Sequence, residues 1–151
     1  MIMKLDLLEF TQLNERYSEI ENIRNFAPLL NDLKVQYSKS IIEACGQLFE
    51  VCPPPKKTMK MTLGNCYLNA HRKFIKGYEY VEGIITNKIS GKEISHAWNV
   101  DSNGKHVDFT IMETEEYEYR GIIIPFSLRQ SVAENTGMIW YCVLPYITLE
   151  K

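Results

Sequence analysis

The sequence has no long apolar run, and this absence excludes a helix that crosses a membrane. Hydrophobic residues make up 45% of the 151 positions, yet no stretch approaches the roughly 20 consecutive apolar residues that such a helix needs. The first residues also lack the apolar segment and small-residue cleavage site of a secretory signal. We therefore expect a cytoplasmic protein without a membrane partner.

Positive charge is also scarce. The chain has 17 Lys and Arg residues against 19 Asp and Glu residues, which gives a formal net charge of −2. Proteins that bind nucleic acid usually present a basic surface to the phosphates. We therefore expect no nucleic-acid partner.

Paired cysteines are missing as well. Cys45, Cys52, Cys66 and Cys142 include no Cys-x-x-Cys pair, and the spacing of cysteines and histidines does not suggest a zinc site. We expect reduced thiols, of which three are small hydrophobic residues and one is reactive. A disulfide between Cys45 and Cys52 is the alternative, but disulfides are rare in the cytosol. No metal and no cofactor are expected.

The order of periodic segments predicts an α+β fold. Apolar residues recur at helical steps over residues 7–24 and 28–49, and a triple proline then breaks the pattern. Alternating, β-branched and aromatic segments follow a short helix. They predict strands at 78–86, 94–100, 105–111 and 117–124, a short helix near 127–135 and a central strand at 138–144. Helices that precede a mostly antiparallel sheet are typical of α+β domains.

Cys66 lies where a thiol is easily activated. Asn65 is a favourable N-cap, so the helix expected over residues 67–75 places Cys66 at its first position. The partial positive charge of a helix N-terminus stabilises a thiolate, and the free backbone N–H groups there can donate to an oxyanion. Asn65 and Asn69 are candidates for a second oxyanion donor. Most free cysteines are buried hydrophobic residues, so Cys66 alone does not establish a nucleophile.

An imidazole and a carboxylate follow the cysteine. On the strand expected at 94–100, His96 and Trp98 share a face. Asp108, on the strand expected at 105–111, lies on that face only if the residue numbers of each opposed pair in the two strands add up to an even number. A three-residue loop that ends at Gly104 gives this register. Asp108 then lies opposite Trp98 and diagonal to His96, within side-chain reach. A two-residue loop is the alternative and would put the carboxylate on the other face.

Other polar and aromatic residues have open roles. His106 can compete for the Asp108 carboxylate, but we expect it to be exposed near the turn, and His71 should face away from the thiol. The acidic run 113–118 is expected to be a solvated loop, or to favour a basic substrate. Four aromatic residues either line a cleft or belong to the core, which is more common for aromatic residues on strands. They are Tyr78, Tyr80, Trp98 and Tyr119.

Three short segments together resemble the transglutaminase-like group of the papain-like cysteine protease superfamily. They are Gly64-Asn65-Cys66-Tyr67, His96-Ala97-Trp98 and Asp108-Phe109-Thr110, with Phe109 where that group has a proline. The resemblance implies Cys66 as nucleophile, His96 as general acid and base, and Asp108 as the residue that orients the histidine. It also implies a fold in which N-terminal helices and a nucleophile-bearing helix pack on an antiparallel β-sheet.

The resemblance further implies chemistry on an amide bond. We expect a thiol hydrolase or acyltransferase, of the peptidase, deamidase or transglutaminase type, that forms an acyl-enzyme with a peptide or protein substrate. Residues 1–52 would be a helical cover and residues 58–151 the catalytic core of a single domain. The residues expected around the substrate are Asn65, Tyr67, Asn69 and Trp98. The alternative is a protein-binding or inhibitory module on the same fold, and the sequence does not indicate the oligomeric state.

Overall fold

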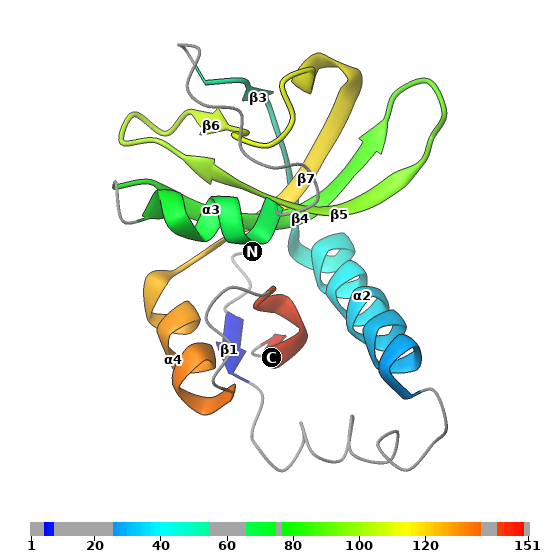
Figure 1. Cartoon of the computed structure of the whole chain (residues 1–151), viewed down its shortest axis with the longest axis vertical. Coiled ribbons are helices and arrows are strands. Elements are labelled where there is room, and N and C mark those ends of the chain that lie inside the picture. The colour runs from blue at the N-terminus through cyan, green and yellow to red at the C-terminus, as the bar shows by residue number, and fades with distance from the viewer. Residues whose placement is uncertain (1–4, 8–25, 55–65, 75–76, 137–141, 150–151) are drawn as a thin grey trace.

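A six-stranded mixed sheet is the largest element of the protein, whose computed structural model describes residues 5–7, 26–54, 66–74, 77–136 and 142–149. The strands lie in the order β2-β7-β4-β5-β6-β3, and only β3 and β6 are parallel neighbours (Figure 1). Their bounds are β2 Gln47–Phe49, β3 Val51–Cys52, β4 Glu79–Asn87, β5 Glu93–Val100, β6 His106–Val107 and β7 Tyr117–Ile124. The mixed sheet, together with the helices, agrees with the predicted α+β class.

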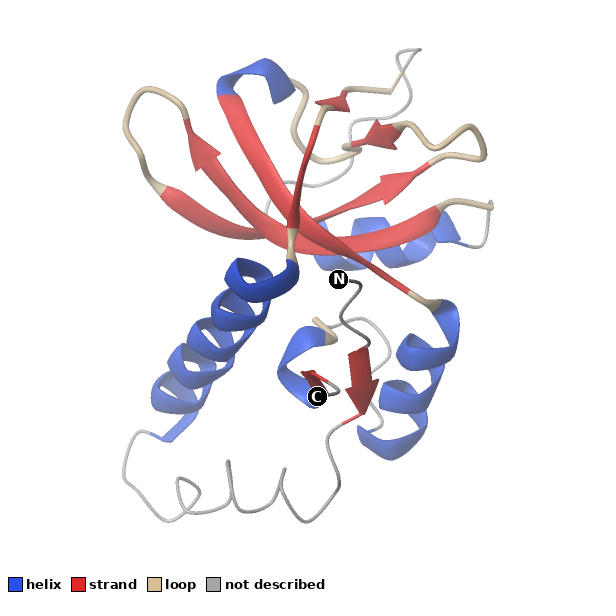
Figure 2. Cartoon of the chain, turned by 180° about the vertical axis from the view of Figure 1, so that it is seen from behind, coloured by secondary structure: helices blue, strands red, loops and turns tan. Residues whose placement is uncertain are grey.

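Helices cover one face of this sheet. They are α2 (Phe26–Cys45), α3 (Cys66–Phe74), α4 (Phe126–Thr136) and the short 3-10 helix η3 (Leu144–Tyr146), while a second 3-10 helix, η2 (Thr114–Glu116), leads into β7. A separate antiparallel pair joins β1 (Leu5–Leu7) to β8 (Ile147–Leu149). Figure 2 shows the sheet as one layer with α2 and α4 on either side of β1 below it.

The core between the sheet and the helices is apolar. Tyr80 and Ile84 of β4 and Ala97 of β5 meet Ile41 and Ile42 of α2 in one buried cluster. Full burial of an aliphatic or aromatic side chain contributes roughly 1.5–3 kcal/mol. This layer therefore fixes the helices against the sheet.

The sheet curls over a second core on its opposite face. β2 and β3 lie at opposite edges of the sheet, yet only Glu50 separates them in the chain. The two edges are thereby joined, and the rings of Phe49 and His106 stack between them with centroids 4.0 Å apart. The curved sheet encloses the buried side chains of Val51, Val81, Ile85, Trp98, Val100 and Tyr119.

Two glycines make room for the indole of Trp98 in this second core. Gly83 and Gly121 face each other across β4 and β7, and a Cβ added to either would lie 2.6 Å from Trp98 Cη2. Trp98 Nε1 donates to His106 Nδ1 at 2.9 Å. The edge of the indole meets the Tyr119 ring, with centroids 5.1 Å apart. The sheet and both rings therefore fix the indole.

Strand and helix predictions hold best in the middle of the chain. β7 has the predicted bounds, β5 begins one residue earlier than predicted, and α3 begins at Cys66. The strand expected at 105–111 is shorter, because β6 ends at Val107 and the chain then turns at Asp108. Of the run 138–144, residues 142–143 are outside any strand and Leu144 begins η3, so that part of the predicted central strand is wrong. Residues 138–141 lie outside the described residues.

The predicted end of the second helix is also wrong. The helix expected to reach Phe49 ends at Cys45, and residues 47–52 join the sheet instead. A Cβ on Gly46 would lie 2.4 Å from the carbonyl oxygen of Ile42, so the chain leaves the helix at a residue without a side chain. Leu7, expected at the start of a helix, lies in β1. The rest of that predicted helix lies outside the described residues.

Candidate active site

A three-residue turn sets the register between β5 and β6. The residue numbers of opposed residues add up to an even number, as predicted; Asn99, for example, pairs with Val107. The N–H of Gly104 donates to the carbonyl oxygen of Asp101 at 3.1 Å, and Gly104 has φ +81°. Only a residue that tolerates the left-handed conformation fits there. The predicted three-residue loop is confirmed, and Asp108 lies on the side of the sheet that carries the imidazole.

His96 and Asp108 form a buried ion pair. His96 Nε2 lies 2.7 Å from Asp108 Oδ2, and the two side chains are 4% and 0% exposed. Burial alone would lower the pKa of His96, but hydrogen bonds to Asp108 and Cys66, together with their negative charges, raise it to about 9. Burial alone would raise the pKa of Asp108, but the contact with His96 lowers it. The imidazole is therefore charged at neutral pH.

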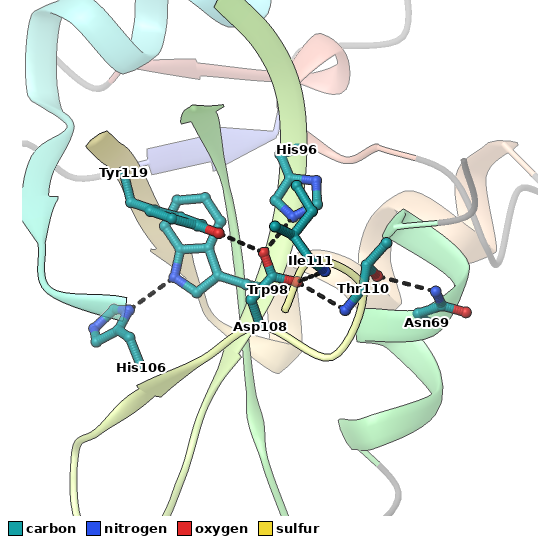
Figure 3. A network of polar contacts seen from close by, with 8 residues as sticks. All are labelled: Asn69, His96, Trp98, His106, Asp108, Thr110, Ile111 and Tyr119. Carbon is teal, nitrogen blue, oxygen red and sulfur yellow. Dashed lines mark hydrogen bonds and ion pairs between the residues drawn. The ribbon is translucent and has the colours of Figure 1, made fainter. Parts of the chain in front are cut away.

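Four hydrogen bonds surround the Asp108 carboxylate (Figure 3). Oδ2 accepts from His96 and, at 2.7 Å, from the hydroxyl of Tyr119. Oδ1 accepts from the backbone N–H groups of Thr110 at 2.8 Å and Ile111 at 3.0 Å. A carboxylate that accepts several hydrogen bonds is held as the anion. Asp108 is thus a fixed negative charge that sets the orientation of the imidazole.

The Cys66 thiol meets the imidazole at an open stretch of the β5 edge. β6 pairs with only the last two residues of β5 and so does not extend along the strand as far as His96. The start of α3 and the loop after β6 meet at this edge, where Asn69 Nδ2 donates to Thr110 Oγ1 at 3.0 Å. The side chain of Cys66, the first residue of α3, is hydrogen-bonded to His96. Because Asp108 holds Nε2, Nδ1 is the ring nitrogen left for the thiol.

Three of the residues predicted around the substrate make contacts within the fold. Asn69 is 3% exposed and holds α3 against the loop after β6, while Trp98 is 1% exposed and belongs to the second core. The burial of Trp98 corrects its predicted place in a cleft. Tyr67 packs against the first core and is hydrogen-bonded to Ser95. Substrate contacts of Asn69 and Tyr67 stay predictions, and Asn65 lies outside the described residues.

The other histidines belong to separate contacts. His106 is 7% exposed and accepts from Trp98, so its predicted exposed position is wrong. Burial lowers the pKa of His106. His71 stacks on the Tyr80 ring and lies 2.6 Å from Arg129 Nη2, on the helical face of the sheet.

A second buried carboxylate lies on that helical face, and no local pattern marks this residue in the sequence. Glu82 accepts from the Tyr80 hydroxyl at 2.6 Å and from the backbone N–H groups of Val143 at 2.6 Å and Leu144 at 3.1 Å. Burial raises the pKa of Glu82 to about 7, although these bonds and the charge of Arg129 act in the opposite direction. Glu82 thus ties the segment before β8 to the centre of the sheet.

Tyr119, Thr110 and Ile111 complete the site, and only part of this was visible in the sequence. An aspartate commonly forms a turn in which its carboxylate accepts the backbone N–H two residues on, and Asp108 forms such a turn. Nothing local marks Tyr119, because it comes from β7, which is not a neighbour of β5.

Within the described part of the chain, no group of three or more His, Cys, Asp or Glu residues is placed to hold a metal ion. Among the helices of these same residues, none combines the length and the apolar character that crossing a membrane requires.

Comparison with known proteins adds no relative. No family model, no curated protein and no solved structure matches this chain. The resemblance to the transglutaminase-like group therefore rests on the segments around Cys66, His96 and Asp108 and on the way these residues meet.

Proposed function

We propose that the protein is a cysteine-dependent hydrolase or acyltransferase that acts on an amide bond of a peptide or protein. Cys66 is the nucleophile, His96 the general acid and base, and Asp108 the residue that orients His96. One observation carries the proposal: a single buried imidazole contacts a helix-borne thiol and, through Nε2, a fully buried carboxylate. A cation beside a thiol favours the nucleophilic thiolate.

The fold is proposed to be a transglutaminase-like variant of the papain-like core. In support, α3 carries the thiol at its start and is tied to β4 and β5, because Asn99 Nδ2 donates to the carbonyl oxygens of Ala70 at 2.9 Å and Glu79 at 3.0 Å. The helices on the same face would be the cover. The parallel pairing of β3 with β6 is a feature that the resemblance did not predict.

In the proposed first half-reaction, the Cys66 sulfur attacks the carbonyl carbon of the substrate. A C–S bond forms, and the carbonyl electron pair moves to the oxygen. The backbone N–H of Cys66, at the first position of α3, is a candidate donor to that oxygen, because helices leave their first N–H groups without an intrahelical acceptor. The C–N bond then breaks, and His96 gives its Nδ1 proton to the leaving amine. A thioester and a neutral imidazole remain.

In the second half-reaction, His96 takes a proton from water or from an amine, which attacks the thioester carbon. The C–S bond breaks, and its electron pair returns to Cys66 as the thiolate. Asp108 keeps its negative charge throughout and stabilises the imidazolium through Nε2. Water as acceptor gives a peptidase or a deamidase, and an amine as acceptor gives a transglutaminase-type reaction.

The cellular setting is proposed to be the cytoplasm. All four cysteines, of which each is partly exposed, are free thiols. Free thiols persist in a reducing compartment. A peptide or protein is the proposed partner.

A reporter ester tests the proposed chemistry without knowledge of the natural substrate. With p-nitrophenyl acetate, we expect release of p-nitrophenol together with an acetyl group on Cys66, read by mass spectrometry of the intact protein and its peptides. Cys66→Ala should abolish the adduct. His96→Ala should slow acylation by about 100-fold or more, the usual contribution of a general acid–base group.

Two other cysteines serve as matched controls. Cys52 and Cys142 are partly buried thiols like Cys66, so Cys52→Ala and Cys142→Ala should keep both the rate and the adduct. Acetylation that spreads evenly over all the cysteines, or p-nitrophenol release that persists in Cys66→Ala, would contradict the proposed nucleophile.

A further inference from the structure

One oxygen of Asp108 serves two side chains at once. His96 Nε2 and the Tyr119 hydroxyl each lie 2.7 Å from Oδ2, and they approach it from different strands (Figure 3). Each donor to a carboxylate stabilises the anion and leaves less of its negative charge for the other donors. The hydroxyl and the imidazole therefore compete for the same oxygen.

Tyr119 is placed for this contact by the shape of the second core. The side chain is 2% exposed and comes from β7, which β4 separates from β5. The Tyr119 ring rests against the edge of the Trp98 indole, which itself occupies the space above Gly83 and Gly121. A phenylalanine would fill the same apolar space, so the hydroxyl adds the contact with Asp108.

The titratable groups around the shared oxygen come from three elements. His96 belongs to β5, Cys66 to α3 and Tyr119 to β7. Burial and the charge of Asp108 raise the pKa of Tyr119, with smaller effects of Tyr117 and of a glutamate in η2. The hydroxyl therefore stays protonated and remains a donor while His96 titrates.

We propose that Tyr119 is a positioning residue of the site: by sharing Oδ2 of Asp108 with His96, its hydroxyl limits how tightly the carboxylate holds the imidazolium proton. The inference rests on the proposed function, in which His96 gives a proton to the leaving amine and later takes one back. A histidine that holds its proton too tightly is a poor acid near neutral pH. Tyr119 thus brings the acidity of His96 closer to the working range.

Removal of the hydroxyl tests the inference in the resting protein. In Tyr119→Phe, we expect the titration of the His96 Cε1–H signal in NMR spectra to move upward by about half to one pH unit, the size of one lost hydrogen bond. The signal is assigned by its loss in His96→Ala. The pH optimum of p-nitrophenyl acetate hydrolysis should move upward with it.

Tyr80→Phe is the matched control, because it removes a similar contact from the opposite face of the sheet. The Tyr80 hydroxyl donates to buried Glu82 at 2.6 Å, so its loss should lower stability without moving the His96 titration. An unchanged or downward titration in Tyr119→Phe, with a loss of stability like that of Tyr80→Phe, would show that the hydroxyl only supports the fold. That result would overturn the inference.

A second variant covers the case in which Tyr119→Phe does not fold. 3-Fluorotyrosine introduced at position 119 keeps the shape of the side chain and is a stronger hydrogen-bond donor, so the His96 titration should move downward. No movement, or an upward one, would overturn the inference. Because the titration needs no turnover, a protein that forms no acetyl-enzyme would count against the proposed function and leave the test of Tyr119 intact.

Discussion

Asp108 has no exposed surface, and its carboxylate accepts hydrogen bonds from two side chains and two backbone N–H groups. These contacts fix the carboxylate in one orientation and keep it ionised. Because the carboxylate cannot turn away, the imidazole that it binds keeps Nε2 on one side and Nδ1 on the side of the thiol. At the scale of single residues, the proposed chemistry therefore depends on the charge of Asp108 as much as on its shape.

Asp108→Asn should lower kcat/KM for p-nitrophenyl acetate by about 100- to 10,000-fold, as in other sites where an aspartate orients a histidine. A neutral amide cannot stabilise the imidazolium, and its NH2 group can favour the wrong tautomer of His96. Asp101→Asn is the control, since Asp101 also accepts backbone N–H groups but in the exposed turn before β6. Equal rates for Asp108→Asn and the wild type would contradict the role given to Asp108.

The pairing of His96 with Asp108 could be predicted as one of two alternatives, because the length of the loop decides the register of the two strands. The Asp-Ser-Asn-Gly segment forms the three-residue loop, and that loop alone decides which face Asp108 occupies. Tyr119 could not be assigned its contact, because only the order of the strands shows that its ring reaches across β4. For Trp98 the choice between cleft and core stayed open, because the joined edges of the sheet, which bury it, leave no local signal.

At the scale of elements, β4 and β7 are shaped around the indole of Trp98. Gly83 and Gly121 are paired across these strands, and because neither has a side chain, the indole has room against the backbone of the sheet. This arrangement brings Tyr119 alongside the indole and toward Asp108. The two strands therefore influence the site without providing a reacting group.

Gly83→Ala should lower the free energy of unfolding by more than about 2 kcal/mol, as overpacking in a tight core does. The new methyl group would lie 2.1 Å from the carbonyl oxygen of Arg120 and 2.6 Å from Trp98 Cη2, so the backbone must shift. Gly104→Ala meets nothing within 4 Å and has only the strain of φ +81°, which costs about 1–2 kcal/mol. Urea unfolding compares the two, and a smaller loss for Gly83→Ala would contradict the tight packing.

Sequence patterns predicted the helices and strands whose own residues show a clear period or cap, and missed the short strands that show neither. The N-cap and helical pattern located the start of α3, and alternation located β5 and β7. β2 is three residues long and begins two residues after α2 ends, so the predicted helix continued into it, and β3 has only two residues. Their strand conformation results from pairing with β7 and β6, which are distant in the chain.

At the scale of the whole molecule, two buried acid–base groups favour the folded state at lower pH. The pKa of Glu82 is raised from 4.5 to about 7, so the folded protein holds its proton more tightly, and stability falls as pH rises through that window. The pKa of His96 is raised from 6.5 to about 9, so its contribution is complete below 6.5 and is lost as pH rises through 9. The lowered pKa of Asp108 acts only at acid pH, where its contribution is lost below 3.8.

We therefore expect the free energy of unfolding, measured in urea, to fall from pH 5 to pH 9. Glu82→Gln removes the first titration, so it should flatten the curve between pH 5 and pH 7, a change on the order of 3 kcal/mol. His96→Gln should flatten the curve between pH 7 and pH 9 instead. A stability that rises over the whole range would contradict both assignments.

Whether His96 activates the Cys66 thiol is tested by the rate at which iodoacetamide alkylates Cys66, followed from pH 5 to pH 10 by mass spectrometry in the wild type and in His96→Ala. We expect rapid alkylation of Cys66 already at pH 6, a strong slowing in His96→Ala, and no such dependence at Cys45, Cys52 or Cys142. An inert Cys66, or one that reacts only near pH 8.5 like an ordinary thiol and is indifferent to His96, would contradict an imidazole-activated nucleophile.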